Sequence, residues 1–482
     1  MRLSPIFALA TFAISSRALA DEITFRRDGA PREEEHGSND DTHDTVRVGS
    51  WRFRPDVQLR AQGEYRRDAA DQQTTTGDAW TLWQRARLSL EGSRDNVRAR
   101  VSLQEARAWG ATSDGAVNAY EAFGEVKMKR ARPAYLRVGR QEIRLGDGRL
   151  IGLADWRPAA RSLDAALGHF STELFDFDAF AAMLRDARPA GPGFGMTDDV
   201  ISTGDQLYAL SITGRFHPLF RVQAMGLLRV ANSLDALGTN ATRSRFLVSS
   251  TSGEMGVASL HVSGEREGWT YGVEGALEFG NTGVLDLNRF ATAAAVRAGK
   301  RFDDIALRPR FRVGGSYASG DDRSGTYRQF DPILPELHAH YGAMDLFTWS
   351  NILEADFEAE IELSRDFHLA GAARYARMAN DQGEWLSGYV TPLSTGGNPG
   401  RSKDLGEEFD VFATYRAAPE VTLHGGYSLY VLGQGAGDML ARTGRSDTAA
   451  DGSLTAPGLS HFAYLQASFV LPEPRTYREE EK

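Results

Sequence analysis

Two-residue alternation of apolar and polar side chains recurs along this chain from Val46 to Leu471. Between Trp51 and Tyr65, apolar residues hold mostly one parity and charged or amide residues the other. Because successive side chains of a β-strand point to opposite faces, the pattern predicts strands with one apolar and one polar face. Eighteen strands are predicted, near residues 51–65, 79–91, 97–107, 119–129, 134–144, 161–169, 173–184, 206–216, 219–230, 256–264, 268–279, 289–299, 306–318, 350–363, 366–378, 407–416, 420–431 and 459–471.

The connections between these strands are alternately short and long. Short turns are predicted at 92–96, 130–133, 170–172, 217–218, 265–267, 300–305, 364–365 and 417–419. Long gaps, expected to face outward, lie at 185–205, 231–255, 319–349, 379–406 and 432–458. Bacterial outer-membrane barrels combine an even number of strands of ~10 residues with short periplasmic turns and long extracellular loops. The sequence therefore predicts an all-β protein, an 18-stranded antiparallel transmembrane β-barrel.

The composition supports strands, and not helices, as the membrane-spanning elements. Mean hydropathy is -0.38, and after the N-terminus no apolar run reaches the ~18 residues that a membrane helix needs. The chain has no cysteine, which excludes disulfides, thiolate metal sites and a lipid anchor on cysteine. Neither a cofactor nor a nucleic-acid partner is expected.

The two ends of the chain differ from the barrel. Residues 1–20 combine Arg2, an apolar stretch and the ending Ala18-Leu19-Ala20, which predicts a secretory signal peptide. Residues 21–45 carry nine acids against three arginines, a net charge of -6, without periodicity. They are predicted to form an acidic, disordered periplasmic arm. The barrel domain is expected at 46–471, followed by a polar tail at 472–482.

Charged side chains should line the interior, because a charge facing lipid costs ~2–4 kcal/mol at the membrane midplane. The first three strands then form a basic wall, with Asp56, Glu64 and Glu91 as the interior acids. In the second charged region, Arg308, Arg310 and Arg312 lie on one predicted strand and five acids lie on the next. The arginines and the acids should neutralise each other as cross-strand pairs. The predicted basic-wall residues are Arg52, Arg54, Arg60, Arg85, Arg87, Arg98 and Arg100, and the acidic strand carries Glu354, Asp356, Glu358, Glu360 and Glu362.

Two sequence blocks, at 136–164 and 316–351, resemble the bacterial alginate export family of outer-membrane porins. The resemblance implies an outer-membrane channel with an arginine-rich constriction that passes anionic polysaccharide out of the periplasm, and not an enzyme. The residues that carry it include Gly139, Gln141, Asp147, Arg149, Asp155, Trp156, Arg161 and Asp164 in the first block, and Asp321, Asp322, Asp331, Pro332, Tyr341, Asp345 and Trp349 in the second.

The resemblance also implies that Arg140 and Arg144 project into the constriction. The alternation conflicts with this, since both residues continue the face of Leu136 and Val138. One hypothesis is that Gly139 marks a β-bulge that resets the register, and the other is that the strand has left the membrane by that point.

Several alternatives stay open. The first alternative is an anion-preferring porin that takes up small acidic solutes. The second, which the sequence favours much less, is a barrel hydrolase with a serine and a histidine that meet near the outer rim. A metal site at His338 and His340, or calcium at Asp321 and Asp322, is disfavoured, and no metal is expected. The expected partners are an anionic polysaccharide or acidic solute, outer-membrane lipid and lipopolysaccharide, and periplasmic export proteins.

Overall fold

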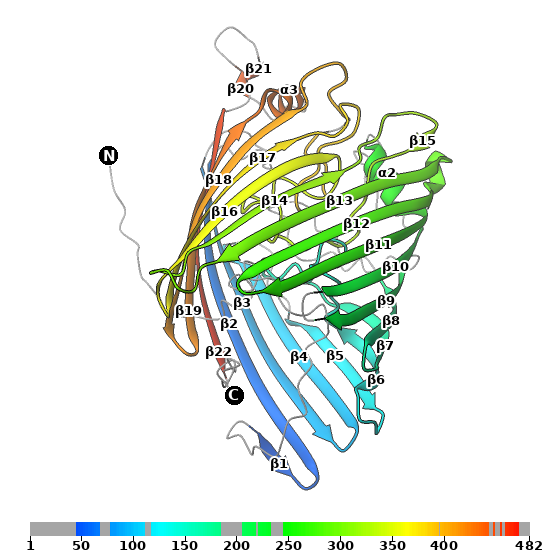
Figure 1. Cartoon of the computed structure of the whole chain (residues 1–482), viewed down its shortest axis with the longest axis vertical. Coiled ribbons are helices and arrows are strands. Elements are labelled where there is room, and N and C mark those ends of the chain that lie inside the picture. Colours follow the sequence, from blue (N-terminus) through cyan, green and yellow to red (C-terminus); the bar gives the residue numbers. More distant parts are fainter. Residues whose placement is uncertain are drawn as a thin grey trace.

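In the residues that the structure describes, eighteen β-strands close into one antiparallel barrel (Figure 1). The computed structural model describes residues 45–67, 78–110, 117–184, 205–217, 220–232, 244–394, 396–442, 447–448, 454–455 and 458–471. The last strand pairs with the first from Val57–Leu471 to Arg67–His461, which closes the ring. The barrel strands are β2 (Trp51–Arg67), β3 (Asp78–Arg94), β4 (Val97–Ala108), β5 (Val117–Lys127), β6 (Ala134–Gln141), β7 (Leu163–Ser171), β8 (Phe175–Met183), β9 (Gln206–His217), β10 (Phe220–Asn232), β11 (Ser252–Arg266), β12 (Trp269–Asn281), β13 (Asn288–Arg301), β14 (Arg310–Ala318), β16 (Ile352–Ser364), β17 (Phe367–Arg377), β18 (Asp404–Ala418), β19 (Val421–Leu432) and β22 (Leu459–Leu471).

The predicted fold class is confirmed, and each strand ends within four residues of its predicted bounds. Short connections alternate with long ones, so the short turns share one end of the barrel, which is the periplasmic end in barrels of this kind. The predicted signal peptide, acidic arm and C-terminal tail lie outside the described residues, as do parts of the gaps at 185–205, 231–255 and 432–458.

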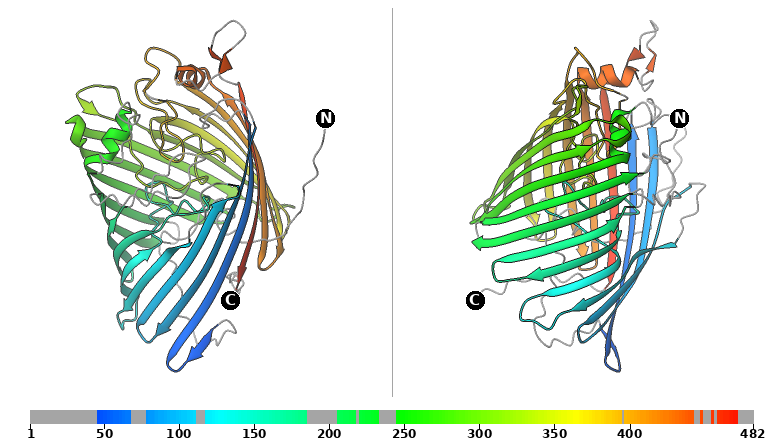
Figure 2. Two further views of the ribbon diagram at one scale, coloured as in Figure 1. Left: turned by 180° about the vertical axis from the view of Figure 1, so that it is seen from behind. Right: turned by 90° about the vertical axis from the view of Figure 1, so that its right-hand side faces the viewer.

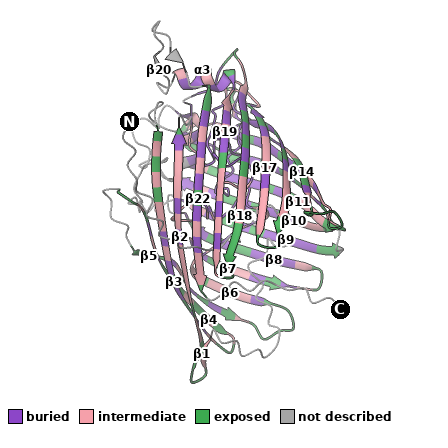
Figure 3. Ribbon diagram, turned by 90° about the vertical axis from the view of Figure 1, so that its left-hand side faces the viewer, coloured by how far each residue is buried: buried purple, intermediate pink, exposed green. Residues whose placement is uncertain are grey.

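Exposure alternates along the strands as a lipid-facing barrel requires. In β12, Thr270, Glu274 and Glu278 are buried, whereas Val273 and Leu277 are 50% exposed. The same alternation of buried and exposed positions is visible along the strands of Figure 3. The apolar side chains outside therefore face lipid, and the polar ones face the lumen.

Smaller elements lie at the two ends of the barrel. Figure 1 shows β1 at the end opposite α3, β20 and β21. In the described part of the chain, no helix is both long and apolar enough to cross a membrane. The smaller elements are β1 (Val46–Val48), α2 (Arg245–Thr251), the 3₁₀-helix η3 (Gly283–Leu285), β15 (Thr326–Tyr327), α3 (Gln434–Arg442), β20 (Asp447–Thr448) and β21 (Leu454–Thr455).

Two loops fold into the barrel and pair with each other there. They are residues 142–162, between β6 and β7, and residues 328–350, between β14 and β16, which we call the lumen insert. The Gly152 N–H donates to the Leu334 carbonyl at 2.8 Å, and the Glu336 N–H donates to the Gly148 carbonyl at 2.8 Å. A Cβ on Gly152 would lie 2.7 Å from the Glu336 nitrogen, so this close approach requires glycine.

The insert spans the lumen. On one side, Arg66 of β2 donates to the Met344 carbonyl. On the opposite side of the ring, Glu278 of β12 accepts a hydrogen bond from the Asp331 N–H at 2.8 Å. Figure 2 shows chain segments inside the ring of strands from two further directions. The prediction that 319–349 faces outward is therefore wrong.

The physical reason for this error is an apolar core inside the barrel. The insert contributes Ile151, Trp156, Ile333, Phe347 and Trp349, each at most 5% exposed. An outward loop would leave these side chains in water, and each large apolar side chain gains about 1.5–3 kcal/mol when fully buried. Alternation within strands carries no information about where a loop goes, so the sequence pattern missed the inward path.

Candidate functional site

Three arginines of the predicted basic wall gather on β2 and β3. Arg60 lies directly opposite Arg85, and Gln58 lies directly opposite Arg87. All three arginines are buried on the lumen face. The strand pairing therefore places three guanidinium groups in one small area, which we call the arginine cluster.

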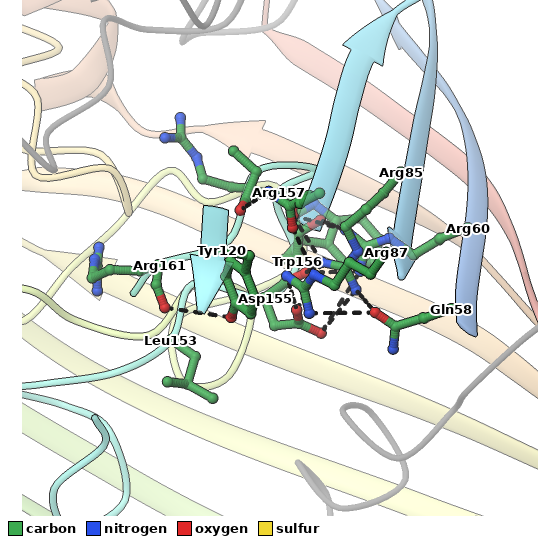
Figure 4. A network of polar contacts seen from close by, with 12 residues as sticks. Gln58, Arg60, Arg85, Arg87, Tyr120, Leu153, Asp155, Trp156, Arg157 and Arg161 are labelled. Atoms are coloured by element: carbon green, nitrogen blue, oxygen red, sulfur yellow. Dashed lines mark hydrogen bonds and ion pairs between the residues drawn. The ribbon is translucent and has the colours of Figure 1, made fainter. Parts of the chain in front are cut away.

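The arginine cluster closes around one carboxylate, that of Asp155 in the lumen insert (Figure 4). Arg85 Nη1 lies 2.7 Å from Asp155 Oδ1, Arg87 Nη2 lies 3.6 Å from the same oxygen, and Arg60 Nη1 lies 3.8 Å from Oδ2. Arg60 also donates to the carbonyls of Asp155, Trp156 and Arg157 at 2.7–2.8 Å. The loop thus offers one full negative charge and several backbone dipoles to three cations.

The electrostatics of Asp155 follow from this arrangement. Burial alone would raise the pKa of Asp155, but Arg85, Arg60 and Arg87 outweigh it and hold the pKa well below its usual range. The carboxylate is therefore ionised, and the cluster with Asp155 keeps a net charge of about +2. An excess of cations on a polar, partly shielded wall attracts anions.

Neutral side chains complete the cluster. Gln58 Oε1 accepts from Arg85 at 3.2 Å and from Arg87 at 3.3 Å. Arg87 Nε donates to Gln104 at 2.6 Å, and its guanidinium lies 3.6 Å from the Tyr120 ring centroid. Sequence reasoning missed these residues, although Gln58 and Gln104 share the lumen parity of the charged residues.

The other predicted basic-wall residues lie toward the periplasmic end. Arg98 pairs with Glu125 at 2.9 Å, and Arg100 pairs with Asp56 at 2.8 Å. A second acid also contacts Arg100, since Glu121 lies 2.7 Å away. Arg52 is exposed and Arg54 is partly buried. The wall therefore divides into the cluster, where three arginines share one carboxylate, and a second part, where Arg98 and Arg100 each contact carboxylates of neighbouring strands.

The second charged region forms the predicted ladder between β14 and β16. Arg310 lies opposite Glu360, and Arg312 lies opposite Glu358. The first pair is 3.3 Å apart, and the second forms a direct ion pair. The ladder continues with Arg308 and Glu362 at 3.4 Å, at the end of the strands. The predicted neutralisation is confirmed for these three pairs, which we call the ion-pair ladder. Glu354 and Asp356 of the same strand instead lie 3.0 Å from Arg374 of β17 and 3.9 Å from Arg297 of β13.

Comparison with known proteins adds the family. The sequence model of the family described as "Alginate export" matches residues 54–189 and 227–449. The chain belongs to the alginate export family. No curated protein matches this chain.

The solved structures most useful for comparison are outer-membrane proteins of Pseudomonas aeruginosa. OpdO is 12% identical with a TM-score of 0.55, over 89% of this chain and 98% of that one. OpdQ is 11% identical with a TM-score of 0.54, over 87% and 98%, and OprD is 10% identical with a TM-score of 0.53, over 87% and 95%. At these identities the likeness shows the fold alone. Family and fold together place this member of the alginate export family in the bacterial outer membrane.

The two family blocks meet in the lumen insert. Arg149 contacts Asp147 at 3.0 Å within the first block and donates to the Tyr341 hydroxyl of the second at 2.8 Å. Its guanidinium also lies 5.6 Å from the Trp349 ring centroid. Arg161 donates to the Leu334 carbonyl at 2.6 Å. Residues that are far apart in the sequence therefore hold one folded unit together.

Acidic residues of the second block form ion pairs within the lumen insert or next to it. Asp345 contacts His338 at 2.9 Å, and Asp331 lies 3.8 Å from Arg229 of β10. Pro332 beside it is buried. Asp321 pairs with Arg245 of α2 at 2.9 Å, and Asp322 pairs with Arg328 at 3.2 Å.

The structure separates the two histidines of the disfavoured metal site. His338 contacts Asp345, whereas His340 contacts Arg297 at 2.7 Å and the Asp147 carbonyl at 3.0 Å. In the described residues, no group of three histidines, aspartates or glutamates is arranged to hold a metal ion.

Arg140 and Arg144 occupy different surroundings. Arg140 lies directly opposite Asp164 of β7, 3.3 Å away. Arg144 belongs to the lumen insert and donates to the Asp147 carbonyl at 2.8 Å. Gln141 is buried and donates to the Ala165 carbonyl at 3.0 Å.

The hypothesis of a bulge at Gly139 is wrong. β6 keeps one register with both neighbours through residue 139, so Arg140 continues the alternation of the exposed Leu136 and Val138. Gly139 is needed for another reason. Its φ is +127°, and a Cβ there would lie 2.2 Å from the Ala122 carbonyl oxygen. Whether Arg140 and Arg144 line a constriction stays a prediction.

Proposed function

We propose that this protein is an outer-membrane channel that exports an anionic polysaccharide, with the arginine cluster as a carboxylate-binding station on the polymer's path. Membership of the alginate export family supports the polysaccharide. The supporting observation on the chain itself is the geometry around Asp155, where three arginines converge on one carboxylate.

Asp155 is an internal stand-in for the substrate. A uronate sugar carries the same carboxylate group, so the contacts that Arg85, Arg87 and Arg60 make with Asp155 are those they would make with a passing sugar. Guanidinium groups suit this task because their fixed fork of donors matches a carboxylate. The side chain of Asp155 is 27% exposed, so an incoming carboxylate can compete with it.

Competition of this kind keeps binding weak enough for transport. A channel must bind its substrate well enough to admit it and weakly enough to release it. When a sugar carboxylate leaves, the Asp155 carboxylate contacts the arginines again, so the three guanidinium groups are never left without an anionic partner. The residual charge of about +2 still favours anions over cations.

The test uses planar bilayers with purified protein and two substitutions of opposite effect. Asp155→Asn removes the competing carboxylate, so anion selectivity and the residence time of an oligouronate should both increase. The triple substitution of Arg60, Arg85 and Arg87 by Gln should abolish both the anion selectivity and the long residence of the oligouronate. Cation selectivity in the wild-type channel, or no response to either variant in a folded barrel, would refute the proposal.

The alternative, uptake of small acidic solutes, makes a different prediction about chain length. A polysaccharide channel should show longer blockades with longer oligouronates, because more sugars contact the wall at once. A small-solute porin should conduct a single uronate and exclude the longer chains. Neutral oligosaccharides of equal length serve as the size control.

A hydrolase finds little support, although one serine, histidine and aspartate do meet. His169 contacts Asp178 at 2.7 Å and Ser171 at 2.9 Å. However, the Ser171 hydroxyl donates to Asp176 at 2.6 Å, and Arg215 holds Asp176 at 2.9 Å. The serine proton is therefore directed to a carboxylate and not to the histidine that would act as its base.

The proposal includes the predicted organisation of the chain. Residues 1–20 act as the signal peptide, residues 21–45 form the periplasmic arm, and residues 472–482 form a polar tail. Outer-membrane lipid and lipopolysaccharide surround the barrel, and periplasmic export proteins deliver the polymer. N-terminal sequencing of the protein from isolated outer membranes tests the cleavage after Ala20.

A further inference from the structure

The charge around the short-turn end of the barrel is uneven. The half formed by β1 to β6 carries ten basic and three acidic residues within 45–54, 91–98 and 124–137, a net charge of +7. The half formed by the turns after β11, β13, β16 and β18 carries seven of each within 265–267, 299–310, 362–368 and 415–421, a net charge of 0. We call the first half the basic rim and the second the neutral rim.

Strand pairing places the cations of the basic rim side by side. Arg47 of β1 lies opposite Arg52 of β2, and Arg52 lies opposite Ser93 of β3. Ser93 in turn lies opposite Arg98 of β4. The exposed members are Arg47, Arg52, Arg94, Lys129, Arg130 and Arg132.

The acids of the basic rim do not match its cations. Three cations share Glu125, namely Arg98 at 2.9 Å, Arg137 at 2.7 Å and Lys127 at 3.8 Å, and Arg98 also lies 3.5 Å from Glu91. Within the part of the chain that the structure describes, Lys129 and Arg132 form no ion pair. The surface therefore has a positive excess that suits an anionic partner.

We infer that the partner is the chain's own acidic segment, residues 21–44, which docks on the basic rim. This segment carries nine acids and three arginines, a net charge of -6. It runs directly into β1, whose Val46 and Val48 are paired with Phe53 and Trp51 of β2 at the rim itself. Opposite charges are thus tethered to each other by the chain.

The length of the segment fits the rim. The r.m.s. span of a flexible chain of 24 residues is about 27 Å, from about 5–6 Å times the square root of the length. Five strand spacings of about 4.8 Å separate β1 from β6, roughly 24 Å in all. A short tether of this kind gives an effective concentration on the order of millimolar, so many weak ion pairs are enough for docking.

Docking has a consequence that rests on the proposed function. An anionic polymer that approaches from the periplasm meets a rim already occupied by carboxylates of the protein. The polymer carries many more charges than the segment, so it displaces the segment and takes over the same cations. The segment thus acts as an internal counter-ion that small anions displace poorly.

The test measures distances between spin labels, which the absence of native cysteine makes direct. Ser38→Cys labels the acidic segment, Ala131→Cys labels the basic rim, and Ala417→Cys labels the neutral rim as the matched control. The control turn, between β18 and β19, is closer to β1 by strand count, since β2, β22 and β19 are successive neighbours. Both rim positions are exposed: Ala131 lies in the connection between β5 and β6, and Ala417 lies near the end of β18, beside the turn to β19.

The expected result is a short-distance population for the 38–131 pair at ~0.01 M salt that falls by at least half at ~1 M, where the screening length drops to ~3 Å. The 38–417 pair should show no such population. Changing Lys129, Arg130 and Arg132 to Gln should reduce the 38–131 population to a similar extent. Equal distributions for both pairs, or no effect of salt, would overturn the inference.

Addition of a long oligouronate separates the two proposals. Loss of the short 38–131 distance on addition, with no loss on addition of a neutral oligosaccharide, supports displacement. A short 38–131 distance that persists after addition of the oligouronate supports docking of the segment, but contradicts its displacement by the polymer. Heat-modifiable migration on gels confirms that each labelled barrel is folded.

Discussion

The arginine cluster and the ion-pair ladder are two charged surfaces of the same lumen that differ in the ratio of arginines to carboxylates. In the ladder, each arginine of β14 faces one carboxylate of β16, so the charges cancel. In the cluster, Arg60, Arg85 and Arg87 share the single carboxylate of Asp155. Buried charge alone therefore does not distinguish the two surfaces, and the proposed binding site is the one where charge exceeds its partners.

The largest expected effect is on the stability of the ladder. Arg312→Gln or Glu358→Gln leaves one buried charge without its partner, which typically costs about 3–5 kcal/mol. The double variant should be more stable than either single variant, because it removes both charges. Urea unfolding of the barrel in lipid vesicles measures this. Single variants as stable as the wild type would show that the ladder is not a unit of paired charges.

The next effect is on ion selectivity at the cluster. Arg85→Gln removes a unit charge that an anion would feel at about 8 Å, worth about 2 kcal/mol at an effective dielectric constant near 20. The anion-to-cation permeability ratio should therefore fall by about thirtyfold, since every 1.4 kcal/mol is a factor of ten, while folding stays normal. The reversal potential in a salt gradient measures the ratio.

Arg308→Gln is the control for that experiment, because Arg308 belongs to the ladder, is exposed and pairs with Glu362. It should change selectivity far less. Equal effects of the two substitutions would erase the distinction between the cluster and the ladder.

A pH effect should appear where the extracellular loops join. Burial raises the pKa of Glu384 to about 7, although hydrogen bonds from Ser244 and Arg245 oppose the rise. The folded loop then binds a proton that the unfolded loop releases near its ordinary pKa of about 4.3. The stabilisation is complete below that value and is lost as pH rises through 7, at up to about 1.4 kcal/mol per pH unit.

Hydrogen exchange of residues 244–251 and 384–394 measures this loss between pH 5 and pH 8, with protection expected to fall as pH rises. Glu384→Gln should remove the pH dependence. A wild-type protein whose protection rises with pH would contradict the assignment.

The smallest effect is expected from Arg140→Glu/Arg144→Glu. Arg140 already faces Asp164, and Arg144 contacts a backbone carbonyl. Neither contributes to the excess charge of the cluster, so selectivity should shift less than in Arg85→Gln. A larger shift in a folded double variant would move the constriction to these two residues and away from the cluster.

Part of the candidate site was predictable from alternation. Arg60, Arg85 and Arg87 were placed on the lumen face because charge is excluded from lipid, and the structure buries all three. Their common partner was not predictable, because Asp155 comes from a loop about 70–95 residues away in sequence. The Glu336 carboxylate, which accepts the Leu153 N–H at 2.8 Å and helps to hold this loop, is farther still.

The sequence by itself determined the barrel, because a two-residue period records which face of every strand meets lipid. It also determined the ladder, since cross-strand partners follow once adjacent strands and their hairpin register are known. Only the tertiary structure decided that two loops fold inward and that three arginines share one carboxylate. Those features depend on apolar packing and charge contacts between segments that are distant in the chain, and no local pattern records them.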